Sequence, residues 1–227
     1  MKLLSINVDA KTRKGTKYGY LTAVQYLSPA NESGVNLCTF ASDGCKAACL
    51  YTAGRGAMDR VKQSRMNRTR LFLTSKHAYF TQLIAEINKL ISKAKRDGLT
   101  PCVRLNGTSD IPFEKIKHCG KTIFQWFPNV QFYDYTKNPN RSNLPSNYYL
   151  TFSRSETNED KAFEMLRKGT NVAVVFRNKL PKKWKGFNVL NGDLSDVRFI
   201  DKANSIVGLI EKGKAKQDET NFVVEPN

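Results

Sequence analysis

The chain has 227 residues, and 40% of them are hydrophobic. This hydrophobic content is enough to form a folded core, so the protein is not wholly disordered. No apolar run approaches the ~18 residues of a membrane-spanning helix, and Asp9 interrupts the short apolar run at the N-terminus, so we expect neither a membrane protein nor a secreted one. The formal net charge of +17 lies mostly within residues 1–150 and predicts an anionic partner, either nucleic acid or a small anionic ligand.

The first segment with distinctive chemistry is residues 36–56, which follow a basic stretch over residues 11–17 that we expect to be loosely ordered. Cys38, Cys45 and Cys49 occur there with C-x6-C-x3-C spacing among glycines and alanines. Three thiolates in such a loop are typical of an iron–sulfur cluster, most simply a four-iron cluster. Nearby Lys46 and Arg55 are expected to favour the thiolate form. An odd total of five cysteines argues against disulfides and favours a reducing cytoplasm.

Zinc is the alternative metal for these cysteines. Structural zinc uses C-x2–4-C pairs and four ligands, and here the pair Cys45 and Cys49 alone has that spacing. The distant residues that could supply a fourth ligand are His77, His118, Cys102 and Cys119. The third interpretation is that all three cysteines are buried without a metal. We expect Cys102, within a strand, to belong to the core.

Two helices follow the cysteine segment. From Met58 onward, Arg65 and Arg68 share one helical face with apolar residues, so we expect them to reach a cluster sulfide, a phosphate or a buried carboxylate. A clearer helix is predicted over residues 78–96, where apolar residues recur at helical spacing and Gly98 follows a basic last turn.

The rest of the chain alternates strand-like and helix-like segments. Strands are expected at residues 101–106, 130–135, 148–152, 171–176, 187–190 and 205–210, helices at 112–120 and 157–168, and a loose tail at 212–220. Such alternation implies parallel βα units with right-handed crossovers. The sequence therefore predicts a single α/β domain over residues 1–227, built as a partial or closed β/α barrel of the TIM type. A doubly wound open sheet is the alternative.

Polar residues gather where the expected strands end, which is where β/α barrels place their sites. There we expect a site for a small polar or anionic ligand or cofactor. Its predicted residues are Asn106, Asp110, Asp134, Lys137, Ser153 and Asp193, together with Arg65 and Arg68. The strand ends also carry Arg104, Thr108, Tyr135, Thr136, Arg154, Arg177, Asn191, Asp196 and Arg198. For each residue a structural role, such as capping by Asp110 or a turn at Asp193, is the competing interpretation.

Several segments together resemble a known family. They are the cysteine segment, VRLNGTSDI (103–111), FYDYTK (132–137), LTFS (150–153), NVAVVF (171–176) and NGDLSDVRFID (191–201). These motifs are similar to those of the gene product 88 family of phage proteins, over residues ~20–215. The resemblance implies a protein of the host cytoplasm.

A more distant resemblance concerns the cysteine triad before βα units, which is similar to the radical S-adenosylmethionine superfamily. That resemblance implies a four-iron cluster held by three cysteines at the mouth of a partial barrel, with S-adenosylmethionine as a candidate cofactor. The spacing here departs from C-x3-C-x2-C, and no Gly-Gly-Glu segment is evident; NGTSD at residues 106–110 is the nearest equivalent.

Three functions therefore stay open. The first is a phage iron–sulfur protein related to radical S-adenosylmethionine enzymes. The second is a nucleic-acid-binding protein with structural zinc or a structural cluster, and the third is an electron carrier whose cluster has a fourth protein ligand. We expect His118 and Cys119 not to be that ligand, because the C-terminus of a helix in a βα unit lies toward the barrel floor.

Overall fold

A ten-stranded, mostly parallel sheet runs through the computed structural model, which describes residues 1–226. Its strands are β1 (Leu4–Ile6), β2 (Tyr20–Gln25), β3 (Thr100–Arg104), β6 (Gln131–Thr136), β7 (Tyr148–Ser153), β8 (Val172–Phe176), β9 (Lys183–Trp184), β10 (Phe187–Asn191), β11 (Ile206–Ile210) and β12 (Val223–Val224). They lie in the order β1-β2-β3-β6-β7-β8-β11-β10-β9, and β12 pairs with β8. The pairs β1–β2 and β9–β10 are antiparallel and the other pairs are parallel.

The helices differ greatly in length. They are α1 (Ala10–Lys14), α2 (Asp43–Ala47), α3 (Asp59–Thr74), α4 (Lys76–Arg96), α5 (Ile123–Trp126) and α6 (Glu159–Arg167). Short 3₁₀ turns are η1 (Gly15–Tyr18), η2 (Leu50–Thr52), η3 (Gly54–Ala57), η4 (Phe113–Lys115), η5 (Arg198–Ile200) and η6 (Gly213–Gln217). A separate hairpin pairs β4 (Lys117–His118) with β5 (Lys121–Thr122). Within residues 1–226, no helix is both long and apolar enough to cross a bilayer.

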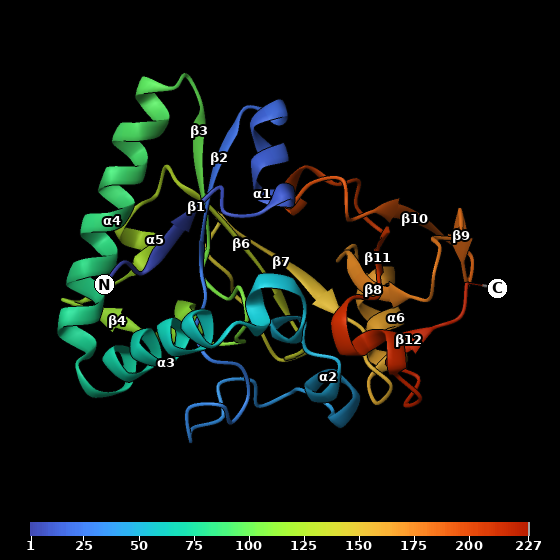
Figure 1. Ribbon diagram of the computed structural model, residues 1–227. Coiled ribbons are helices and arrows are strands. Elements are labelled where there is room, and N and C mark those ends of the chain that lie inside the picture. Colours follow the sequence, from blue (N-terminus) through green and yellow to red (C-terminus); the bar gives the residue numbers. More distant parts are fainter. Residues whose placement is uncertain (227) are drawn as a thin grey trace.

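Helix α4 covers the part of the sheet formed by β1, β2 and β3 (Figure 1). It buries Tyr79, Phe80, Leu83, Ile87 and Leu90 at helical spacing, and these side chains form the larger hydrophobic core with the apolar residues of β2, β3 and β6. Helix α6 packs against β7 and β8 and buries Ala162 and Leu166 in a second core. The two cores lie along one sheet, so the fold is a single mixed α/β domain.

The predicted closed barrel is wrong, because the sheet has two free ends. Strands β1 and β9 lie at opposite ends of the order, and in the described part of the chain no pairing joins them. Each is short and runs antiparallel to its single neighbour, so neither continues the parallel series that a β/α barrel requires. The sheet is therefore open, which fits both the predicted partial barrel and the doubly wound sheet that was its alternative.

Most of the predicted elements are confirmed, but three segments differ. The helix expected at residues 112–120 is instead η4 followed by the β4–β5 hairpin, because Cys119 and Gly120 have positive φ angles of 49° and 80°, outside the right-handed helical region. Residues 11–17, expected to be loose, form α1 and η1, and Asp9 caps α1. The expected loose tail contains η6.

Candidate metal centre

Cys38, Cys45 and Cys49 line one cavity, of about 600 Å³, at the carboxyl ends of the parallel strands. The opposite wall comes from residues at or just after the ends of β3, β6, β7 and β11. In Figure 1 helix α2, which carries Cys45, lies on the side of the sheet toward which β7 points. Parallel strands bring their carboxyl ends to the same edge, which explains why residues far apart in the chain meet here.

The loop is held against this edge by specific hydrogen bonds. The backbone N–H of Asp110 donates to Leu37 O at 2.9 Å, which fastens the segment before Cys38 to the turn after β3. Glu156, in the segment after β7, accepts from Ser42 Oγ and from Gly44 N, both at 2.8 Å, and so fixes the start of α2. These contacts position two of the three cysteines without any metal.

Burial controls the chemistry of the thiols. It raises the pKa of Cys38 to about 11, although the N–H of Ala30 donates to its sulfur at 3.4 Å and opposes the shift. Burial also raises the pKa of Cys49, against backbone hydrogen bonds and the charge of Lys137. Burial therefore outweighs the charge of nearby basic groups on the pKa of these two thiols. A bound metal would have to displace their protons.

The loop cysteines do not form a ready-made site for a single ion. Among residues 1–226, the group of three His, Cys, Asp or Glu ligand atoms that lie within 4.8 Å of one another is His77, His118 and Cys119. Thiolates bind both zinc and iron–sulfur clusters, and in a multi-iron cluster each cysteine binds a different iron.

Five of the predicted ligand-binding residues line the same cavity as the cysteines. They are Asn106, Asp110, Lys137, Ser153 and Asp193. Asp134 does not line the cavity. Its side chain is fully buried and accepts a hydrogen bond from Asn106 N at 2.7 Å, so Asp134 lies behind Asn106, which does line the cavity. Cys102 is fully buried in the core, as expected, and neither His118 nor Cys119 lines the cavity.

The two arginines of α3 lie outside the cavity wall. Arg65 is 2% exposed and pairs with Glu32 at 3.3 Å, so it reaches a buried carboxylate, one of its three predicted partners. Glu32 lines the cavity, and Arg65 thereby positions it. Arg68 donates to Lys2 O at 2.8 Å and ties α3 to the N-terminus.

Lys11 and Lys212 also line the cavity, although their segments looked like loose ends in the sequence. They approach the same oxygen of Asp193, at 3.7 Å for Lys11 and 2.6 Å for Lys212. Burial lowers the pKa of Lys11, and Asp196 and Asp193 partly offset the shift. Neither lysine could be predicted from the local sequence, because their contacts with Asp193 bring together segments from opposite ends of the chain.

Arg104 is another cation of the cavity wall, and the sequence marked it only by its place at the end of a strand. It pairs with Asp196 at 3.3 Å and lies over the ring of Tyr135 at 4.7 Å. Burial alone would raise the pKa of Asp196, but the charges of Arg104 and Lys11 outweigh it and keep that pKa below its usual value.

Two polar atoms of this deep corner are buried and make no hydrogen bond within residues 1–226. They are Arg104 Nε and Tyr135 Oη. Both residues line the cavity. Buried polar groups are nearly always partnered, so these two atoms are an exception. A carboxylate oxygen, Oδ1 of Asp134, lies 4.0 Å from Arg104 Nε.

The side chains that line the cavity are more basic than acidic. The cations are Lys11, Lys46, Lys62, Arg104, Lys137, Arg154 and Lys212, and the carboxylates are Glu32, Asp110, Asp193 and Asp196. Other strand-end residues named from the sequence, Arg177, Asn191 and Arg198, lie outside the lining. The arrangement can hold an anion beside three thiols and orient it through fixed cationic groups.

Comparison with known proteins gives one relationship. No curated protein and no solved structure gave a significant match to the chain. The family model described as gene product 88 matches residues 2–226, which is nearly the whole sequence. Several of the segments whose sequence resembles that family contribute to the cavity wall: the cysteine segment, the turn after β3, and the ends of β6 and β7. The chain belongs to the gene product 88 family.

Proposed function

We propose that the cavity binds an iron–sulfur cluster, most simply a four-iron cluster, through Cys38, Cys45 and Cys49, with a small anionic ligand beside it. The observation that carries the proposal is that three thiols line the same cavity as the cations Arg104, Lys137 and Lys212. The C-x6-C-x3-C spacing, in which only Cys45 and Cys49 match a zinc pair, supports a cluster over a single zinc ion.

Bound by three cysteines, such a cluster would offer one iron with an exchangeable position, at which a ligand with oxygen or nitrogen donors binds. The chain's own residues suit such a ligand. The ammonium of Lys137 has no carboxylate within 4.0 Å in the described part of the chain and lies over the ring of Phe222 at 5.4 Å. The N–H of Ala30, which donates to the Cys38 sulfur, would stabilise the thiolate once its proton has left.

A more specific version of the proposal is that the protein is a phage enzyme related to radical S-adenosylmethionine proteins. An open sheet whose parallel strands end beside a three-cysteine loop supports it, since a partial barrel is also open. The cavity offers cations for the carboxylate of S-adenosylmethionine and carboxylates, Asp110 and Asp193, for its amine. The different cysteine spacing and the missing Gly-Gly-Glu segment weigh against it.

The cluster is tested by anaerobic purification followed by iron, zinc and acid-labile sulfide analysis. We expect about four iron and four sulfide per chain, lost in Cys45→Ala and retained in Cys119→Asn, a matched cysteine change outside the cavity. One equivalent of zinc bound through Cys45, with no iron or sulfide, would overturn the cluster and leave a structural metal.

The exchangeable position is tested by electron paramagnetic resonance of the reduced cluster. Addition of S-adenosylmethionine or methionine should shift the resonance, and the shift should weaken in Lys137→Gln. An unchanged resonance with either compound leaves an electron carrier. Salt-dependent association with single- or double-stranded oligonucleotides, unaffected by Lys137→Gln, would favour nucleic acid as the anionic partner.

A further inference from the structure

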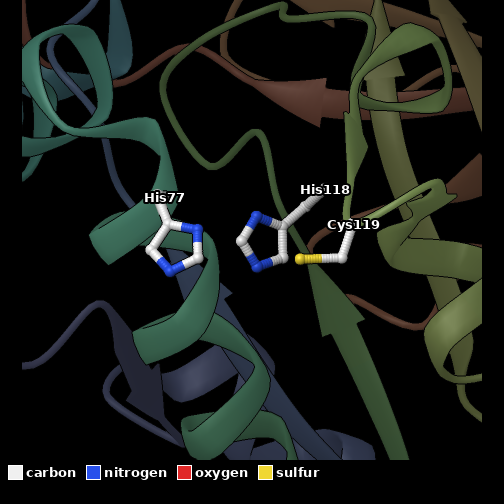
Figure 2. Close-up of side chains that lie close together, drawn as sticks. All are labelled: His77, His118 and Cys119. Carbon is white, nitrogen blue, oxygen red and sulfur yellow. The ribbon is translucent and has the colours of Figure 1, made fainter.

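The chain's two histidines and its one exposed cysteine meet at a second place, outside the cavity. One ring nitrogen of His77, one ring nitrogen of His118 and the sulfur of Cys119 all lie within 4.8 Å of one another. Figure 2 shows the three side chains in a row, with the His118 ring between His77 and the sulfur of Cys119. The two histidine rings have centroids 5.0 Å apart. Imidazole nitrogen and thiolate sulfur are the ligands that zinc prefers.

The fold brings these residues together from distant parts of the sequence. His77 lies in the first turn of α4, while His118 ends β4 and Cys119 follows in the two-residue turn to β5. The His118 ring stacks on Phe80 of α4, with centroids 5.6 Å apart and an angle of 22°. The His118 carbonyl accepts from Trp126 Nε1 at 3.2 Å. The ring of the central ligand is thus held by stacking on Phe80 and its backbone by the hydrogen bond from Trp126, as a preorganised site requires.

Cys119 occupies an unfavourable backbone conformation. Its φ angle is 49°, and Gly120 after it has a φ angle of 80°. Two successive positive φ angles are typical of a type I′ turn, whose first position favours Asn, Asp or Gly. Cysteine has no such preference, so the conformation is strained at this residue. A cysteine that is kept in a strained conformation indicates that its sulfur has a role at this position.

The three candidate ligands are also free to bind. Within residues 1–226, no hydrogen bond involves a ring nitrogen of His77 or His118, or the sulfur of Cys119. His77 and Cys119 are exposed, and His118 is partly buried, so an ion can enter from solvent. Ligands around a tetrahedral zinc ion lie about 3.3–3.8 Å apart. The exposed side chains would close the remaining distance by small rotations.

We propose that His77, His118 and Cys119 form a zinc site that joins the β4–β5 hairpin to the N-terminal turn of α4. The two imidazoles bind as neutral ligands, and Cys119 binds as a thiolate, so that its proton passes to solvent when the metal binds. Water or an external ligand takes the fourth position. The site uses none of the cavity's cysteines and is independent of the proposed cluster.

The test is a zinc titration of the full-length protein against a competing chelator, with iron and zinc measured on the same samples. Wild type is expected to take up one zinc that Cys45→Ala retains. His77→Ala and Cys119→Asn should each lower the affinity by at least about 100-fold and leave the iron content unchanged. Cys119→Asn is the sharper variant, because Asn-Gly is the preferred type I′ sequence and the hairpin should fold at least as well without the sulfur.

A second readout follows the hairpin itself. Zinc should slow amide hydrogen exchange over residues 117–122 in wild type, and it should have no effect there in Cys119→Asn. The neighbouring change Lys76→Ala, beside His77 at the start of α4, serves as the control and should keep both zinc and protection. Equal zinc uptake by wild type and Cys119→Asn, or no uptake by wild type, would overturn the site whether or not the cluster exists.

Discussion

The backbone N–H of Asn106 donates to one carboxylate oxygen of Asp134 at 2.7 Å, and the Asn106 side-chain amide approaches the other oxygen at 3.3 Å. Asn106 Oδ1 in turn accepts from Ile111 N and from Ser109 Oγ, both at 2.9 Å. A fully buried carboxyl group therefore holds the turn after β3, which lines the cavity, in one conformation. The first prediction concerns this group.

Asp134 should make stability depend on pH. Burial raises its pKa to about 6, although Arg104 and the hydrogen bonds oppose the shift. The folded chain then holds this proton more tightly than the unfolded chain, so the stabilisation is complete below about pH 4 and is lost as the pH rises past 6. We expect about 2 kcal/mol of the free energy of unfolding to be lost between pH 4 and 7 through this group.

Urea unfolding at pH 4, 5.5 and 7 in wild type and in Asp134→Asn measures the effect. The difference in the free energy of unfolding between the two proteins should change across this range, because the amide cannot ionise. A difference that stays constant with pH would mean that Asp134 keeps an ordinary pKa.

Gly107→Ala should destabilise the protein and disturb the cavity. A Cβ at this position would lie 2.6 Å from Gln25 O and 2.7 Å from the ring of Tyr26, so backbone must move. We expect a loss of about 1–3 kcal/mol, measured by the denaturant midpoint. Gly44→Ala is the comparison, because its Cβ would meet the movable ends of Thr220 and Glu156, and its cost should be smaller.

Removing the proposed cluster should loosen residues 36–56 more than the sheet. The loop buries few large side chains, and Phe40 and Leu50 in it are exposed, so apolar packing contributes little there. Chelation or Cys45→Ala should raise amide hydrogen exchange in this segment and leave β6 and β7 protected. Cys119→Asn is the control and should show native protection in the loop. Unchanged exchange after metal removal would show that the hydrogen bonds of Glu156 suffice.

Arg141→Met should be strongly destabilising. The Arg141 side chain is 1% exposed and pairs with Glu114 and, at 3.4 Å, with Asp110 of the cavity wall. Removing the cation leaves a buried carboxylate without a partner, which costs about 3–5 kcal/mol. Adding Glu114→Gln should restore part of the loss, and calorimetry of both variants checks this. If the double variant is no more stable than Arg141→Met, the pair is not the cause.

The local spacing of apolar residues in the sequence predicted much of the fold. The run VAVVF at residues 172–176 could be recognised as a buried parallel strand, and the spacing of apolar residues predicted α4, because burial of one face imposes its period on the sequence. The three clustered cysteines identified the segment that lines the cavity, and the order of strands predicted that their carboxyl ends would meet there.

Only the tertiary structure decided where the sheet ends and what completes its cavity. Whether β1 and β9 pair depends on contacts between residues far apart in the sequence, and the local spacing of apolar residues does not predict such contacts. Lys11 and Lys212 come to Asp193 from opposite ends of the chain. The turn at Cys119 lacks the Asn-Gly sequence that is usual for a type I′ turn, and the local sequence predicts a helix there. The approach of Cys119 to His77 could therefore not be predicted from the sequence. A contact between residues that are distant in sequence is fixed by packing of whole elements, and that information exists only once the chain has folded.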